Sequence, residues 1–104
     1  MLVTRNQSKH RSAEAVELWN YLTAESGTSI SVAYAELNGS HPESISPNTD
    51  RCYIFLSGMA KMNVEDNSYS ISSGDVVYVE RGKRHSMEGQ ATYYVINNPP
   101  FQRK

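Results

Sequence analysis

Two side chains of this sequence are suited to recognise or convert a small molecule, Arg51 and His85. An arginine guanidinium stays charged at physiological pH and can form two parallel hydrogen bonds to a carboxylate or a phosphate. A histidine titrates near neutral pH, so His85 is a candidate general acid or base, a candidate ligand residue, or a side chain that only hydrogen-bonds to a neighbour. Arg51 has a plainer alternative as a surface charge at a strand end, paired with Asp50 or Glu80.

Tyr53 is the third candidate for ligand binding. It lies two residues after Arg51 in a β-rich run, and side chains two apart on a strand point to the same face. A tyrosine buries its ring while its hydroxyl seeks a polar partner. The chain contains 7 Tyr, and core packing accounts for most of the others.

Composition excludes several classes of protein. The 104 residues include 10 Lys and Arg against 11 Asp and Glu, for a net charge of -1, with no basic block that would indicate nucleic-acid binding. No stretch approaches the length of a membrane-spanning segment, and residues 1–8 lack the apolar run of a signal peptide. The lone Cys52 excludes an intrachain disulfide. We therefore expect a cytoplasmic protein with no membrane partner.

The N-terminal quarter predicts a short helix. Residues 1–11 are polar and are interpreted as a tail or a pairing strand, with one domain over residues 12–104. From Ser12 apolar residues recur at spacings of three and four, and Gly27 offers a stop. This pattern predicts a short amphipathic helix, or an irregular segment, over residues 13–24.

After Gly27 the apolar period falls to two, which is typical of β-strands. Asn38-Gly39 is interpreted as a turn and residues 41–50 as a loop. Many short strands at close, even spacing predict an all-β sandwich or barrel. The predicted strands are residues 29–37, 52–56, 60–64, 67–71, 75–79, 85–88 and 91–97.

Two segments, residues 53–58 and 74–85, resemble the two signature motifs of the cupin superfamily. The first is an aromatic strand that closes on Ser57-Gly58. In the second, Gly74-Asp75, Gly82 and His85 stand at the spacings of the family motif, with Glu80 in place of the usual proline. The resemblance covers about residues 28–100. It implies a cupin-type β-barrel, also called a double-stranded β-helix or jelly roll.

The resemblance also implies a metal site, which this sequence keeps only in part. Metal-binding cupins place two histidines and a glutamate of the first motif beside the histidine of the second. Here His85 is kept, Arg51 stands where the glutamate belongs, and the two histidine positions fall within residues 44–47, which contain none. Because a fixed positive charge repels a divalent cation, we expect no cofactor. If a divalent transition metal is bound, its ligands would be His85 with His41, Glu43 or Asp50.

The sequence therefore favours a small single-domain cupin that binds a small polar ligand, such as an anion, through Arg51, Tyr53 and His85. The alternative is a metal-dependent cupin enzyme, a dioxygenase, isomerase or lyase, in which His85 works with ligands outside the motifs. A third interpretation is an accessory domain with no chemistry of its own. The resemblance further implies a homodimer. Fold alone does not decide among these, because one fold hosts many activities.

Overall fold

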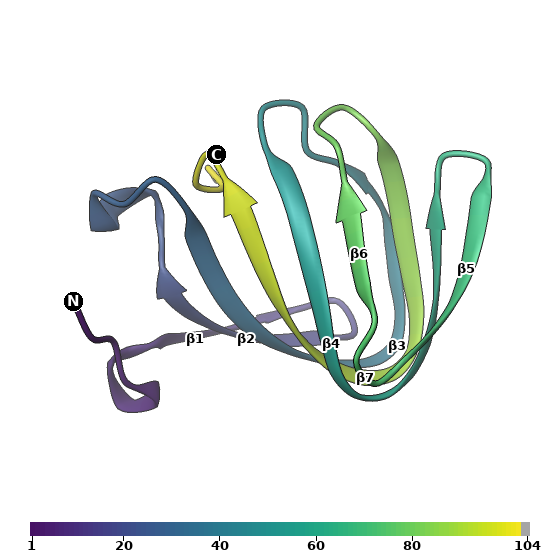
Figure 1. Cartoon of the computed structure of the whole chain (residues 1–104). Helices are drawn as coiled ribbons and strands as arrows, with labels where there is room; N and C mark the ends of the chain where they lie inside the picture. Colours follow the sequence, from purple (N-terminus) through teal and green to yellow (C-terminus); the bar gives the residue numbers. More distant parts are fainter. Residues whose placement is uncertain (103–104) are drawn as a thin grey trace.

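Three long strands carry most of the fold in a computed structural model that describes residues 1–102. They are β3 (Ser31–Ile45), β4 (Asp50–Val64) and β7 (Arg84–Asn98). β7 lies between the other two and pairs with both in antiparallel orientation. Figure 1 shows the three strands curving together, so that one sheet forms two facing arms.

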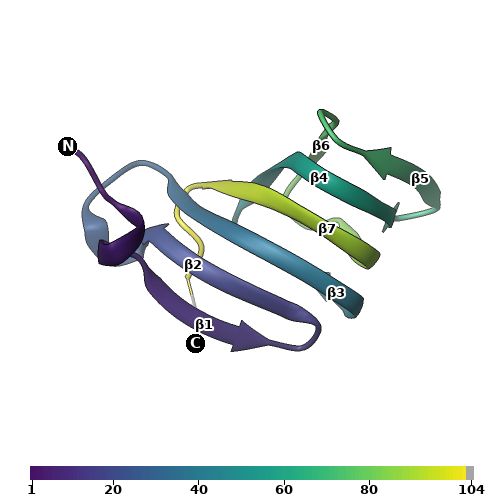
Figure 2. The ribbon, with the colours of Figure 1, turned by 90° about the horizontal axis from the view of Figure 1, so that it is seen from below.

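Shorter strands extend the two arms. The strand order is β1-β2-β3-β7-β4-β5, which Figure 2 shows from below, and β6 pairs with the first part of β4. No helix among the described residues is both long and apolar enough to cross a membrane. The remaining elements are η1 (Arg5–Gln7), β1 (Lys9–Ala13), β2 (Val16–Leu22), η2 (Ala24–Ser26), β5 (Asn67–Ser72) and β6 (Val76–Val79).

Glycines allow the long strands to bend without ending. Gly39 pairs with Gly89, and Gly58 and Gly89 have positive φ angles of 82° and 136°, a region that favours glycine. A Cβ at Gly58 would overlap the carbonyl oxygen of Gln90, and one at Gly89 would lie 2.5 Å from the carbonyl oxygen of Met59. The backbones of β4 and β7 therefore approach too closely here for any side chain, which produces the bend.

Alternate side chains of the long strands point into the concave face and form the core. Phe55 and Met62 of β4 are almost fully buried, as is Ala35 of β3. Ala35 lies directly opposite Tyr93 in the register, so a small side chain makes room for a large ring. Burying a side chain as large as Phe55 contributes roughly 1.5–3 kcal/mol to folding.

The helix predicted over residues 13–24 is wrong, because this segment forms β2 and the end of β1. The two strands pair as a hairpin whose turn contains Ala15, at a φ angle of 64°. The side chains of Val16 and Leu18 lie on the concave face, whereas Trp19 contacts the rings of His10 and Tyr34. The apolar spacing fits a helix by coincidence, and pairing with β3 decides the outcome.

Two predicted interruptions are also corrected. Asn38-Gly39 is not a turn, and residues 41–45 are not a loop, because β3 continues through both. The separate strands predicted at 52–56 and 60–64 belong to β4, and those at 85–88 and 91–97 belong to β7. In each case the glycine between them bends the strand instead of ending it.

Candidate functional site

Arg51 lies near the start of β4, where neutral groups hold its guanidinium. Its Nε donates to Oδ1 of Asn97 at 2.8 Å, and its Nη1 donates to the Tyr53 hydroxyl at 3.0 Å. The ring of Phe101 has its centroid 4.9 Å from Cζ of Arg51. Within residues 1–102 no carboxylate comes within 4.0 Å of this guanidinium. Arg51 is thus a half-buried cation without an acidic partner in the described chain.

The sheet register fixes the partners of Arg51. Asn97 lies opposite Arg51 on one side and opposite Ser31 on the other, so the three residues form a row across β4, β7 and β3. The Asn97 amide donates to the Ser31 hydroxyl at 3.0 Å. The backbone N–H of Phe101 donates to the same hydroxyl, also at 3.0 Å. The C-terminal segment is therefore tied down beside Arg51.

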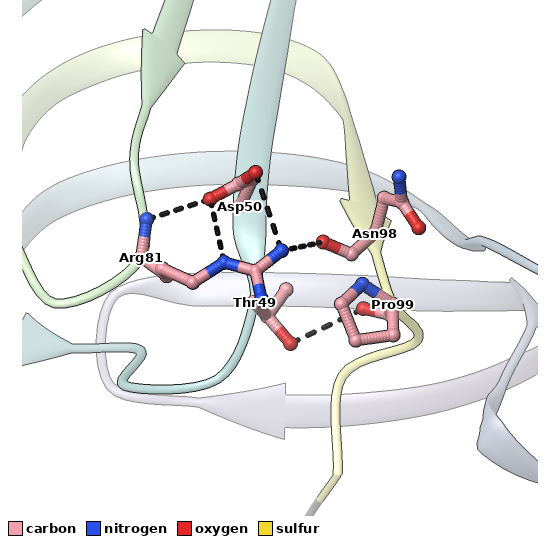
Figure 3. Close-up of polar contacts among 5 residues, drawn as sticks. All are labelled: Thr49, Asp50, Arg81, Asn98 and Pro99. Atoms are coloured by element: carbon pink, nitrogen blue, oxygen red, sulfur yellow. Dashed lines mark hydrogen bonds and ion pairs between the residues drawn. The ribbon is translucent and has the colours of Figure 1, made fainter.

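Asp50, one of the two acidic residues proposed as a partner of Arg51, binds Arg81 instead, as Figure 3 shows. It accepts hydrogen bonds from the backbone N–H and Nε of Arg81 at 2.8 and 3.1 Å. These bonds lower the pKa of Asp50 to about 2, the side-chain bond of Arg81 being the largest cause. The same guanidinium reaches the carbonyl of Asn98, and Thr49 bonds to the carbonyl of Pro99. This group of contacts ties the end of β7 to the start of β4.

His85 is buried on the concave face, and its two ring nitrogens have different partners. Nδ1 lies 3.2 Å from the carbonyl oxygen of Lys83, and Nε2 lies 3.3 Å from the hydroxyl of Ser44. Because a carbonyl only accepts, Nδ1 carries the proton in the neutral ring and Nε2 accepts from Ser44. Burial lowers the pKa of His85 below its ordinary value, and the Arg51 charge adds to this effect. The imidazole is therefore mainly neutral at pH 7.

Two tyrosines line the space between Arg51 and His85. The Tyr53 ring meets that of His85 edge-on at 6.2 Å between centroids, and its hydroxyl accepts the bond from Arg51. The Tyr93 ring packs against Tyr53 and Phe55 at 5.4 and 5.3 Å. Burial raises the pKa of both tyrosines, so both hydroxyls stay protonated.

Arg51 borders two adjoining cavities. The inner cavity, of about 80 Å³, is lined by His41, His85, Tyr53, Tyr93 and Arg51 among others. The vestibule, of about 510 Å³, is lined by residues that include Lys9, Arg11, Glu25, Phe101 and Arg51. The three residues that the sequence proposes for ligand binding, Arg51, Tyr53 and His85, thus come together around one space. That geometry offers a fixed positive charge, a neutral imidazole and phenolic hydroxyls to a small molecule.

Similar solved structures exist at low sequence identity. Pac13 from Streptomyces, described as a nucleoside dehydratase, is 17% identical, with a TM-score of 0.87 over 98% of this chain and 84% of its own. A predicted oxalate decarboxylase from Thermotoga maritima is 18% identical, with a TM-score of 0.81 over 95% and 99% of the two chains. The chain has the cupin fold.

Comparison by sequence alone finds no match for this chain. No protein-family model matches the chain, and no curated protein matches it. A third structural neighbour, the ectoine synthase of P. lautus, is 16% identical, with a TM-score of 0.81 over 88% of this chain and 69% of its own. At such identities the likeness establishes the fold and leaves the activity to be argued from the site.

The side chains of this cupin cavity do not fit a divalent cation. Of the candidate metal ligands, His41 lines the inner cavity with His85, whereas Glu43 is exposed and Asp50 is bound by Arg81. Among residues 1–102, no three His, Cys, Asp or Glu side chains gather in a way that could hold a metal ion. The cavity instead contains the guanidinium of Arg51, whose fixed charge opposes a divalent cation.

The sequence does not predict several residues that line the two cavities. Tyr93 lines the inner cavity, and Asn97 and Phe101 line the vestibule, although none belongs to a recognised motif. Alternation along residues 91–97 carries a signal, because Ala91, Tyr93, Val95 and Asn97 share one face of a strand. The contact between Arg51 and Phe101 has no local signal, since it depends on how the C-terminal segment returns to β3.

Proposed function

We propose that this cupin binds a small organic anion, a carboxylate or a phosphate, at Arg51, with Tyr53 and His85 as further contacts and without a metal. The observation that carries the proposal is that the charge of Arg51 has no acidic partner among residues 1–102. Taking a charge even partly out of water is costly unless the charge is paired. A planar anion that accepts two parallel bonds from the guanidinium would supply the missing partner.

The residues around the vestibule support an anionic ligand. Lys9 and Arg11 line it together with Arg51, whereas Glu25 is the acidic residue of the lining. Such an excess of positive charge raises the local concentration of anions and speeds their entry. Neutral partners hold Arg51 in place before a ligand arrives, so little ordering entropy is lost on binding.

His85 supports the same proposal as a neutral side chain that can exchange hydrogen bonds with a ligand. A carboxylate or phosphate next to the ring would favour its protonated form, so ligand binding should take up protons near neutral pH. The catalytic role expected for His85 stays a prediction of the sequence.

A ligand screen by thermal shift tests the proposal. Organic acids and sugar phosphates should raise the melting temperature, and matched neutral compounds should not. Uridine and uridine monophosphate belong in this panel, because Pac13 has been solved with uridine and the two compounds differ by one phosphate. Stabilisation by uridine monophosphate but not by uridine would support recognition of the phosphate by Arg51. Stabilisation by neutral compounds as strong as by anions would contradict the proposal.

We also propose that the chain forms a homodimer through apolar residues of the sheet or of the 13–24 segment. A domain of this length has limited room for a core, and association is a common supplement. Light scattering at tens of micromolar protein should give the mass of two chains. A monomer under these conditions would contradict this part of the proposal.

A further inference from the structure

Tyr93 is a buried residue whose hydroxyl has no hydrogen-bond partner among residues 1–102. The residue is only 5% exposed, and its ring packs against Tyr53 and Phe55. Within residues 1–102 no side chain or backbone group hydrogen-bonds to this hydroxyl, in contrast to the Tyr53 hydroxyl, which accepts from Arg51. Buried hydroxyls are nearly always bonded to protein, water or ligand.

The inner cavity is where this hydroxyl can find a partner. Tyr93 lines the cavity, and no fully buried side-chain polar atom of residues 1–102 lacks a hydrogen bond, so its hydroxyl keeps some access to the space. At about 80 Å³, the inner cavity is small beside the vestibule of about 510 Å³. It therefore suits a hydroxyl-bearing part of a ligand better than a whole ligand.

Arg51 connects this cavity to the anion site. Its guanidinium borders both the inner cavity and the vestibule, so one small molecule can contact Arg51 and Tyr93 together. The raised pKa of Tyr93 keeps the hydroxyl protonated, so that it can donate as well as accept. His85 lines the same space with a neutral ring whose Nε2 accepts hydrogen bonds.

We propose that the inner cavity is a hydroxyl-binding subsite and that the ligand is a small hydroxylated organic acid, with its acid group on Arg51 and its hydroxyl on Tyr93. This inference rests on the proposed function, because it assumes that Arg51 holds the acid group. It makes Tyr93 the residue that distinguishes a hydroxy acid from the corresponding acid without the hydroxyl. Sites built to hydrogen-bond a hydroxyl discriminate strongly against analogues that lack it, because their own polar groups are left unpaired.

Matched pairs of acids test the subsite by isothermal titration calorimetry. The pairs are lactate against propionate and malate against succinate, each differing by one hydroxyl. Wild-type protein should bind the hydroxylated member of at least one pair about tenfold more tightly or better. In Tyr93→Phe the preference should disappear, while affinity for the acid without the hydroxyl stays the same. The control is Tyr94→Phe, because Tyr94 contacts Tyr34 instead of lining the cavity, and it should keep the wild-type preference.

The outcomes separate the subsite from the proposed function. If acids bind but show no preference for the hydroxyl, or if Tyr93→Phe keeps the preference, the subsite is overturned and the anion site stands. If none of these four acids binds, the subsite is overturned, and the proposed function is decided separately by the thermal-shift screen, which also contains phosphates. A second readout is the melting temperature of the free protein, which Tyr93→Phe should leave unchanged or raise, since it removes an unpartnered hydroxyl. A clear fall would reveal a structural partner for Tyr93 and overturn the proposal.

Discussion

Asp50 and Arg51 are neighbours on β4, and they use their charges in opposite ways. Asp50 accepts hydrogen bonds from both the backbone and the side chain of Arg81. Arg51, one residue later, has an amide and a phenol as its hydrogen-bond partners. The first charge is paired within the chain, whereas the second has no acidic partner among residues 1–102.

The difference indicates what each charge does. The pair of Asp50 and Arg81 is partly exposed, so it holds two strand ends together at a modest gain in stability. Arg51 makes no ion pair with the described residues that would compensate for its partial burial, and a bound anion would supply one. We therefore propose that Asp50 stabilises the fold and that Arg51 binds the ligand. Each of these roles can be tested by experiment.

The largest effect is expected when the two arginines are replaced one at a time. Arg51→Gln should weaken binding of an anionic ligand by about 2–5 kcal/mol, the typical loss for one partner of a buried charge-assisted pair. Arg81→Gln should leave that affinity unchanged, because Arg81 contacts Asp50 and Asn98 outside both cavities. Calorimetric titration of both variants measures the contrast. Equal losses would remove the distinction between the two arginines.

The second-largest effect should be a dependence of stability on pH that is caused by His85. Its pKa is lowered in the folded protein from an ordinary value of 6.5, so the unfolded chain binds more protons in that range. The free energy of unfolding should therefore fall as pH decreases from 7 through the folded pKa. His85→Gln should flatten this slope in urea titrations at several pH values. An unchanged slope in His85→Gln would contradict this role of His85.

Asp50 should act in a lower pH range and with a smaller effect. Its folded pKa of about 2 lies below its ordinary value of 3.8, so its contribution to stability is present above about pH 4 and is lost as pH falls through 2. Asp50→Asn should remove that loss from melting curves recorded between pH 5 and 2. Asp66→Asn is the control, since among residues 1–102 the hydrogen bonds and ion pair of this turn involve Glu65 and not Asp66. If the two variants behave alike, Asp50 does not hold the strand ends together.

The sequence predicts the strands of this fold better than their bends. Residues 67–71 and 75–79 coincide closely with β5 and β6 because their ends are true turns. The predicted strands end near Gly58 and Gly89, since a glycine at positive φ has the same signature in a turn and in a bulge. The helix over residues 13–24 failed for another reason. The strand that forms there instead is stabilised by pairing with β3, which lies outside the segment whose apolar spacing predicts the helix.

The candidate site likewise contains residues that the sequence predicts and residues that depend on how the strands pair. Arg51 and Tyr53 lie two residues apart on one strand, so parity alone predicts that they share a face, and they are hydrogen-bonded. His85 came from the spacing of a family motif, and its ring does lie beside Tyr53. Ser44, which bonds to His85 from 41 positions away, and Asn97, which bonds to Arg51 from 46, are set by strand register. Nothing in a single sequence fixes that register in advance.

The smallest expected effect is that of removing metal ions. Dialysis against a chelator should leave both the melting temperature and anion binding unchanged, because the cavity has Arg51 where a cation would need a carboxylate. Elemental analysis of protein purified without chelator should find well below one equivalent of transition metal. A stoichiometric metal that survives dialysis would contradict the distinction drawn here between Asp50 and Arg51. It would require His41 and His85 to bind a cation together with Glu43, or with an Asp50 released from Arg81.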